Sequence, residues 1–401
     1  MLILSLIISF ATIIFMVNRK IPIGIAVVTG GILLSMLVGL KIPRIIAIII
    51  EGLVDKDTIE LVLAVIMITV LSNMMRSYGV LDKMVESLEQ LFHNTKTLIF
   101  VIPSLLSTFS ATGSAIVAAP ILNNLGDRVG LSQTRKAAIN IYIRHVWYFV
   151  LPIAVHLINA SFIAEIPISR LILAQIPIAV ICFITAYLVY LAPVKDVRTG
   201  MISGERKAVI YFNAFRYTSP VLISIILVFF MPFYLALVVS CLLTYYLKTE
   251  NVNLKDVLAK GINPPVIYAA AGVMVFKNII KNIPELGQLI EQTIKLGIPL
   301  EVVFVIMTLI LAYVAANVSL TVSMMYPLVL PLVPAEHSIA AAMLIYISAY
   351  TAYMISPIHM CQALTIEYFG VSLKELYKEY VITIPVMFLS GVLTYIFMVC
   401  F

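Results

Sequence analysis

The chain has 401 residues, of which 62% are hydrophobic and only 11% are charged, and its formal net charge is +6. A soluble globular domain carries about a quarter charged residues, so this composition excludes a water-soluble protein. The long apolar runs indicate an all-α polytopic membrane protein, because backbone polar groups in lipid must be bonded within their own segment. The positive charge falls in the loops, so it indicates topology and predicts no nucleic-acid partner.

The first apolar run, 1–17, precedes the positive pair Arg19 and Lys20. A cleavable signal peptide has the opposite order, so we expect this run to be a first membrane helix. The four cysteines lie singly in apolar runs, without metal-binding spacing, and we interpret them as small buried side chains.

Six apolar segments precede a polar stretch in the middle of the chain, and six follow it. In chain order they fall at about 1–17, 21–40, 59–79, 97–125, 137–160, 168–193, 217–230, 233–247, 264–280, 302–333, 338–366 and 379–401. Two motifs of the first six recur about 205 residues later: Asn73-Met-Met-Arg76 recurs as Asn278-Ile-Ile-Lys281, and Pro152 recurs as Pro357. Further matches keep the same order. The sequence therefore predicts a duplication, with a first repeat at 1–193, a cytoplasmic linker at 194–216 and a second repeat at 217–401.

The fourth segment of each half, 97–125 and 302–333, is too short for two spans of about 20 residues each and has a polar middle. One hypothesis is a re-entrant hairpin with small polar residues at its tip; the other is a single crossing. Most of the 26 Lys and Arg side chains fall on the cytoplasmic side only if both segments turn back, so the positive-inside rule favours hairpins. Five crossings per half follow, and an odd number makes the two repeats inverted. Both termini are then outside the cell membrane.

The fifth segments, 137–160 and 338–366, each contain a proline inside an apolar run. Proline removes a helical hydrogen bond, so each segment is either a helix broken in the middle or an ordinary kinked helix. The recurrence of the break in both halves favours two broken helices that face two hairpin tips.

This pattern resembles the ion transporter superfamily, whose dicarboxylate, citrate and gluconate carriers share inverted repeats with a hairpin and a broken helix. Their hairpin tips carry a Ser-Asn-Thr signature, to which Ser110-Ala-Thr112 and Asn317-Val-Ser319 correspond approximately. In length and overall pattern the chain also resembles the uncharacterised prokaryotic membrane family named domain of unknown function 401. The resemblance implies a homodimer in the lipid bilayer that moves a small-molecule solute.

Helix N-termini at such breaks suit anions, and helix C-termini suit cations. The predicted substrate-binding residues at the two tips are Ser110, Thr112, Ser114, Asn317, Ser319 and Thr321. A coupling Na⁺ is expected near Ser110, Thr112, Asn317 and Ser319. The alternative interpretation is that these small residues only permit close helix packing.

Arg144 lies roughly 18 Å along the helix that is expected to start near Ser132, a depth that is costly for a charge. We expect Arg144 to bind the substrate anion, His145 to carry a coupling proton, and His359, after Pro357, to contact either. An arginine that reaches the cytoplasmic face, and histidines that are bonded inside the protein, are the alternatives.

These patterns predict a secondary active transporter that moves a small, carboxylate-type anion coupled to Na⁺ or H⁺, with no other cofactor. No HExxH motif and no pair of acidic residues occurs within the spans, so an enzyme is not expected. The alternative function is a cation/proton antiporter or an accessory subunit of a membrane complex.

Overall fold

The computed structural model describes residues 2–92, 94–107, 113–195, 197, 207–283 and 299–400, without the side chains of residues 3, 18 and 113–117. Every regular element in these ranges is a helix, and none is a strand. Five helical stretches are long and apolar enough to cross a membrane, or six if the bent pair α13–α14 counts as one span. The chain is therefore an all-helical protein of membrane type.

The helices of the first half begin with the short apolar helices α1 and α2. They are α1 (Leu2–Asn18), α2 (Ile23–Leu37), α3 (Ile42–Val54), α4 (Lys56–Ser77), α5 (Val80–Leu91), α6 (Thr95–Leu106), α7 (Gly113–Arg128), α8 (Gln133–Trp147), α9 (Val155–Ala164) and α10 (Ile168–Ala186), which continues as the π-helical turn Tyr187–Leu191.

The helices of the second half follow a similar order. They are α11 (Lys207–Leu227), α12 (Phe233–Tyr246), α13 (Leu254–Gly261), α14 (Pro264–Lys281), α16 (Leu300–Ala315), α17 (Val318–Val329), the 3₁₀ turns Leu330–Leu332 and Ala335–His337, α18 (Ser338–Ile355), α19 (Met360–Phe369) and α20 (Leu373–Cys400).

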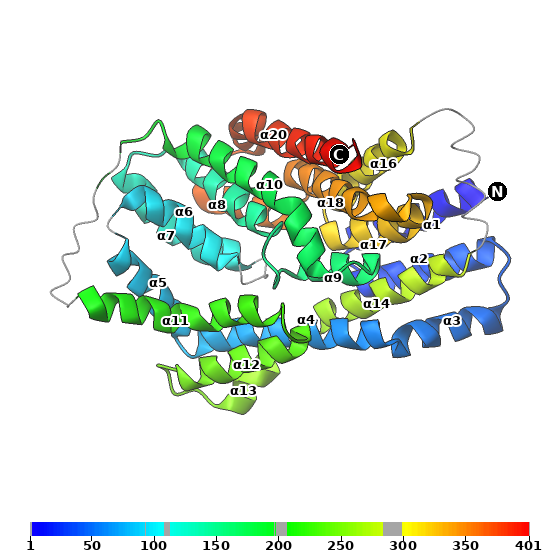
Figure 1. Ribbon diagram of the computed structural model, residues 1–401, viewed down its shortest axis with the longest axis horizontal. Coiled ribbons are helices and arrows are strands. Elements are labelled where there is room, and N and C mark those ends of the chain that lie inside the picture. The colour runs from blue at the N-terminus through cyan, green and yellow to red at the C-terminus, as the bar shows by residue number, and fades with distance from the viewer. Residues whose placement is uncertain are drawn as a thin grey trace.

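These helices form two layers along the long axis of the molecule (Figure 1). The first layer contains α2, α3, α4, α11, α12, α13 and α14, in which α2 packs on α14 and α12 packs on α4. The second layer contains α6–α10 and α16–α20, in which α16 packs on α18 and α10 packs on α20. Helix α1 packs on α2 and touches α16, so it joins the two layers on one side.

Glycine sets the closest helix crossing, between α2 and α14. A Cβ atom on Gly24 would lie 1.8 Å from the carbonyl oxygen of Tyr268, and one on Gly272 would lie 2.5 Å from the carbonyl oxygen of Gly24. Only glycine lets the two backbones approach this closely, as is common at helix interfaces in membranes.

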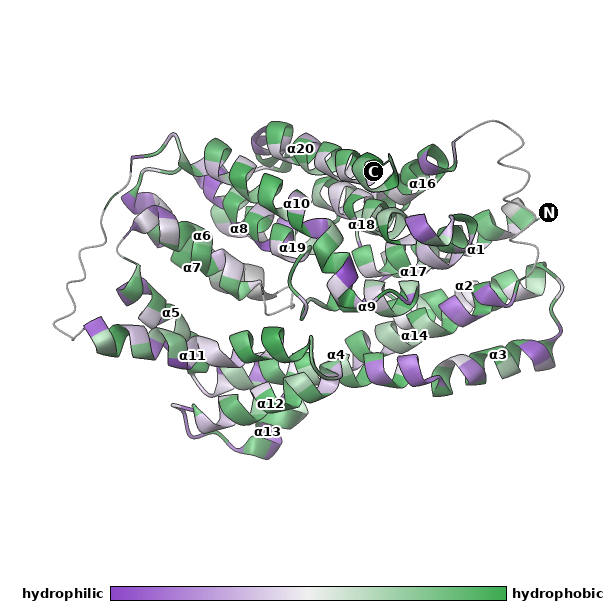
Figure 2. Ribbon diagram, viewed as in Figure 1, coloured by the Kyte–Doolittle hydropathy of each residue, from purple (hydrophilic) through white to green (hydrophobic). Residues whose placement is uncertain are grey.

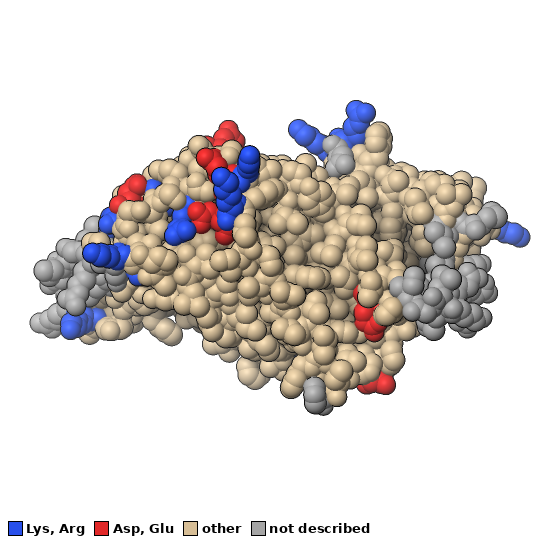
Figure 3. Space-filling model, turned by 90° about the horizontal axis from the view of Figure 1, so that it is seen from above, with Lys and Arg blue, Asp and Glu red and all other residues tan. Residues whose placement is uncertain are grey.

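The outer surface is apolar over most of its area. Large side chains such as Phe230 and Tyr246 are 80% and 81% exposed, and hydrophobic residues make up much of the helices in both layers (Figure 2). Seen from above, charged side chains gather in groups that leave a broad uncharged area between them (Figure 3). An apolar surface of this extent fits contact with lipid chains rather than with water.

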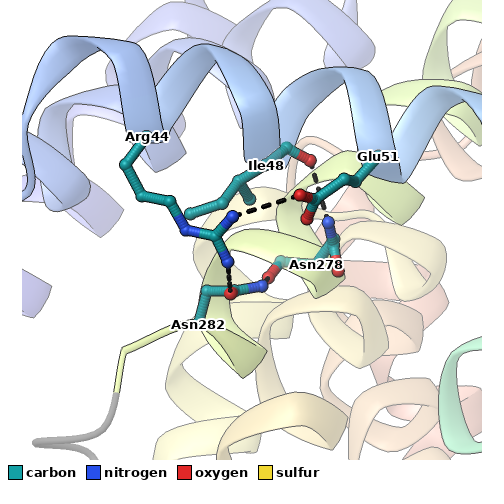
Figure 4. Close-up of polar contacts among 5 residues, drawn as sticks. All are labelled: Arg44, Ile48, Glu51, Asn278 and Asn282. Carbon is teal, nitrogen blue, oxygen red and sulfur yellow. Dashed lines mark hydrogen bonds and ion pairs between the residues drawn. The ribbon is translucent and has the colours of Figure 1, made fainter.

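Two asparagines tie short amphipathic helices to the long helices of the first layer. Asn278 of α14 donates to the Ile48 carbonyl of α3 over 2.8 Å, beside Arg44, which bonds to Glu51 and Asn282 (Figure 4). In the corresponding contact, Asn73 of α4 in the first half donates to the Val257 carbonyl of α13 in the second half over 2.7 Å.

The second layer contains two helix pairs and two interruptions. Helix α6 packs on α7, and α16 packs on α17 after a connection in which Ala316 has a left-handed φ of 44°. Residues 148–154 separate α8 from α9, and residues 356–359 separate α18 from α19. Pro152 and Pro357 lie in these two connections, where proline has no helical hydrogen bond to break.

Two features differ from the expectation. Helix α11 begins at Lys207, inside the stretch 194–216 that was expected to be a linker, because its apolar residues from Ala208 to Phe215 continue the helix. In addition, several segments that were expected to cross the membrane form helices of only 10–17 residues. Ten crossings therefore stay a prediction.

Candidate functional site

A cavity of about 730 Å³ lies between the two layers. Its lining includes residues of α2, α4 and α14 from the first layer and residues of α9, α17 and α19 from the second layer. The polar and charged residues among them are Lys20, Thr69, Ser72, Asn73, Arg76, His156, Asn159, Lys260, Asn263, Asn317 and Ser319.

Ser319 organises the polar wall that the second layer contributes. Its hydroxyl oxygen lies 2.8 Å from His156 Nδ1 and accepts a hydrogen bond from Asn159 Nδ2 over 3.0 Å. Asn317 caps α17, since its side-chain oxygen accepts from the Leu320 amide over 2.8 Å. Two residues of α9 and two residues at the start of α17 thus form one polar surface.

Three helices begin at this wall. Val155 is the first residue of α9, Asn317 is the N-cap of α17, Met360 is the first residue of α19, and all three line the cavity. Helix N-termini carry partial positive charge and unpaired N–H groups, so three of them at one cavity favour an anion.

Cationic side chains lie on the other wall. Arg76, in the last turn of α4, is half-buried, and its Nε and Nη2 atoms are buried without a hydrogen-bond partner. Lys20 and Lys260 line the same cavity, and no acidic residue is among its described lining residues. Buried donors without a partner cost roughly 1–3 kcal/mol each, a cost that an anionic ligand would remove.

A second polar cluster is buried in the second layer. Arg144 and His145, near the end of α8, are 0% and 1% exposed, and His359 at the start of α19 is 0% exposed. The rings of His145 and His359 are 4.9 Å apart, and Tyr353 stacks on His359 at 3.8 Å. Arg144 interacts electrostatically with both histidines.

Two tyrosines separate this cluster from the cavity wall. Tyr148 contacts His145 at 5.4 Å and His156 at 5.8 Å between ring centres, and Tyr350 contacts the same two histidines at 6.5 and 6.1 Å. The cluster and the cavity are thus one aromatic layer apart.

The residues predicted from the sequence separate into three groups. Asn317 and Ser319 line the cavity. Arg144, His145 and His359 form the buried cluster and do not line it, and Thr321 is buried while its hydroxyl donates to the Asn317 carbonyl. Ser110 and Thr112 lie outside the described residues, as does the side chain of Ser114.

The oxygens of the two described residues of the expected Na⁺ site already take part in hydrogen bonds. The Asn317 side-chain oxygen accepts from the Leu320 amide, and the Ser319 hydroxyl contacts the amide of Asn159 and the ring of His156. A Na⁺ ion bound by these two oxygens would therefore compete with these hydrogen bonds.

Sequence reasoning missed Arg76 and Asn159 as cavity residues. Arg76 belongs to the repeated motif Asn73-Met-Met-Arg76, but the positive charge of the chain was expected to lie in the loops, so Arg76 was not predicted to be a site residue. Asn159 follows His156 by three residues, which places both on one face of α9, and this spacing was the available signal.

An ion-pair group connects the two layers at a different place. Glu165, just after α9, pairs with Lys277 of α14 at 3.1 Å and also with Lys281, beside a small cavity of about 120 Å³. Partial burial raises the pKa of Glu165, but the two lysines outweigh this effect and bring the pKa below its ordinary value of 4.5.

The fold and the two polar sites define an all-helical membrane-type protein with a cationic cavity between two helix layers. The chain belongs to the family described as "Protein of unknown function (DUF401)", whose family model matches residues 2–399. No curated protein matches the chain.

Proposed function

We propose that this protein is a secondary transporter that moves a small anion, of the carboxylate type, by alternating access coupled to Na⁺ or H⁺. The observation that carries the proposal is the composition of the cavity. Three helix N-termini and three cationic side chains surround it, and its described lining contains no carboxylate. A cation/proton antiporter would need acidic residues in this position, so the cavity favours an anion.

Matching contacts in the two halves support an origin by duplication. Asn73 and Asn278 occupy the same motif position, and each donates to the backbone carbonyl of an amphipathic helix in the opposite half. A glycine of each amphipathic helix meets the helix that bears the asparagine: a Cβ on Gly261 would lie 2.9 Å from Val70, and one on Gly52 would lie 3.2 Å from Val275.

The helix pairs of the second layer support re-entrant hairpins and broken helices. The pair α6–α7 corresponds to α16–α17, and the interruption after α8 corresponds to the one after α18. Polar backbone that ends inside a membrane is tolerated where it lines a cavity, and α9, α17 and α19 begin at one. We therefore infer two inverted repeats, each with one hairpin and one broken helix.

Unequal packing of the two repeats supports alternating access. Helix α17 packs on α14, and α9 packs on α4 and α14. Their counterparts α7 and α19 have no comparable packing on the first layer among the residues that the structure describes. If α7 and α19 packed on the first layer and α17 and α9 moved away from it, the present cavity would close and another would open on the opposite side.

Transport in proteoliposomes tests the proposal directly. With an imposed Na⁺ or proton gradient, uptake from a panel of labelled carboxylates should include at least one substrate that saturates. Arg76→Gln removes the charge at the cavity and should lower its uptake at least about tenfold, because a charge-assisted hydrogen bond contributes about 1.5–3 kcal/mol. Lys83→Gln is the matched control, since Lys83 is exposed and pairs only with Glu86 in the described structure.

Cation exchange without uptake of any anion would refute the proposal in favour of an antiporter. Equal uptake by the Arg76→Gln and Lys83→Gln proteins would show that the cavity is not the substrate site. Arg144→Ala should also abolish uptake if the buried cluster takes part in transport. The homodimer stays a prediction, and its mass in detergent tests it.

A further inference from the structure

The cluster behind the aromatic layer contains three side chains that are typical metal ligands. A nitrogen of His145, a nitrogen of His359 and the sulfur of Cys361 all lie within 4.8 Å of one another. His145 belongs to α8, while His359 and Cys361 lie on either side of the first residue of α19. The broken chain after α18 therefore brings two ligands to a third from another helix.

The hydrogen bonding of His145 leaves one nitrogen available. Its Nδ1 lies 2.6 Å from the Ile141 carbonyl oxygen, which can only accept, so Nδ1 carries the proton. Nε2 is then the unprotonated nitrogen with a free lone pair. Metal-binding histidines typically donate their second nitrogen to such a carbonyl, which fixes the tautomer and the ring orientation.

The imidazole of His359 is buried without a hydrogen bond. The residue is 0% exposed, and neither Nδ1 nor Nε2 has a partner. A buried polar group without a partner is unfavourable relative to water, so the arrangement is costly unless a ligand uses the lone pair. Tyr353 stacks on the ring at 3.8 Å between ring centres and holds it in this orientation.

Cys361 lies at the start of a helix. It is the second residue of α19, so a metal-bound thiolate at this position would face the partial positive charge of the helix N-terminus. A sulfur ligand at this position suits a soft metal ion.

The positive charge of Arg144 decides which ion the site accepts. Cu⁺ that replaces the thiol proton leaves the net charge of the cluster unchanged, whereas Zn²⁺ adds one unit of charge to a site in which both histidines are buried. An uncompensated buried charge is strongly unfavourable, and soft thiolate and imidazole ligands suit Cu⁺. We infer that His145, His359 and Cys361 form a buried binding site for a soft monovalent metal ion, Cu⁺.

Binding forms one Cu–S and two Cu–N bonds and breaks the S–H bond of Cys361. The proton leaves to the solvent, and the oxidation state of copper does not change. The site stands apart from anion transport, since it uses none of the residues that line the cavity.

Copper titration of the full-length protein tests the site. The protein carries Cys400→Ser, which removes the exposed thiol, and Cu⁺ is titrated without oxygen against a chromophoric chelator. One Cu⁺ per chain is expected. Cys361→Ser and His359→Ala should each weaken binding more than about tenfold, because loss of even the hydrogen-bond partners of ligands costs about 10- to 100-fold. Cys241→Ser changes a buried cysteine outside the cluster and should leave binding intact.

X-ray absorption of the copper-loaded protein with only Cys400 replaced avoids any folding defect of the ligand variants. One sulfur and two nitrogen neighbours are expected around copper. Failure to bind Cu⁺, a copper shell without sulfur, retention of binding by Cys361→Ser, or Zn²⁺ bound as tightly as Cu⁺ would each overturn the inference. None of these results would alter the uptake measured for Arg76→Gln, so the two proposals fail separately.

Discussion

Ser319 connects two helices through a single hydroxyl at the cavity. It lies within hydrogen-bond distance of His156 and Asn159, which would otherwise have unpaired polar groups at this wall. Ser319→Ala should therefore weaken binding of the transported anion by roughly tenfold, the equivalent of one hydrogen bond. The apparent affinity in the uptake assay measures this effect.

A second serine of α17 provides the control. Ser323 is fully buried and donates to the Leu320 carbonyl of its own helix, so Ser323→Ala should leave the affinity unchanged. If both alanine variants bound the anion as well as the unaltered protein, the polar wall would have no part in recognition.

Single residues could be predicted from the sequence where a motif marks them, and not where only the fold brings them together. Asn317 and Ser319 were found because polar residues in the middle of an apolar segment are rare. Arg76 was missed because a basic residue that follows an apolar run is the usual sign of a loop. The pairing of Cys361 with His145 depends on a contact across the break after α18, which no local pattern indicates.

At the scale of helices, Glu165 holds the second layer against the first. It ends α9 in the left-handed conformation at φ 57°, while Gly370 ends α19 at φ 63°. Glycine adopts this conformation freely, and other residues lose roughly 1 kcal/mol or more. The cost indicates that the carboxylate is needed, and its two lysine partners on α14 supply the reason.

Glu165→Gln should remove this ion pair and lower the thermal midpoint. The free energy of unfolding should fall by only roughly 1 kcal/mol, because the carboxylate is half-exposed. Since the pKa of Glu165 is depressed in the folded protein, the stabilisation is present at neutral pH and is lost as the pH falls through that lowered pKa, below 4.5. Melting curves of both proteins from neutral to acidic pH measure the difference.

Glu86→Gln is the control, because Glu86 forms only an exposed pair with Lys83 in the described chain and should change the midpoint little. The thermal midpoints of Glu165→Gln and the unaltered protein should converge as the pH falls. If their difference stayed constant down to pH 3, the charge of Glu165 would not be the cause of that difference.

The helices themselves were predictable to different degrees. The connections after α8 and α18 contain the prolines that suggested them, because proline marks its break in the sequence itself. The short helices α3 and α13 were not predicted, because they are amphipathic and carry charges that interrupt the apolar pattern. Their bonds to Asn278 and Asn73 depend on contacts between distant parts of the chain.

For the whole molecule, orientation in the membrane decides whether the two halves are inverted. Labelling with a membrane-impermeant maleimide in a Cys400→Ser background tests it at three exposed positions. Gln133→Cys and Val197→Cys should react only from the cytoplasm, and Lys56→Cys should react only from outside. The reason is that the excess of basic loops faces the cytoplasm only when both fourth segments turn back, which places the loop before α8 and the central linker on the side opposite to Lys56.

Reaction of Gln133→Cys from the same side as Lys56→Cys would mean that the first half crosses the membrane once more than proposed. The helix pairs α6–α7 and α16–α17 would then each make a single crossing instead of a hairpin, and the repeats would lie parallel. A parallel arrangement could not exchange the packing of α17 on α14 for that of α7 on α4 through a two-fold axis in the membrane plane. Alternating access would then need another physical basis, because its argument rests on this exchange.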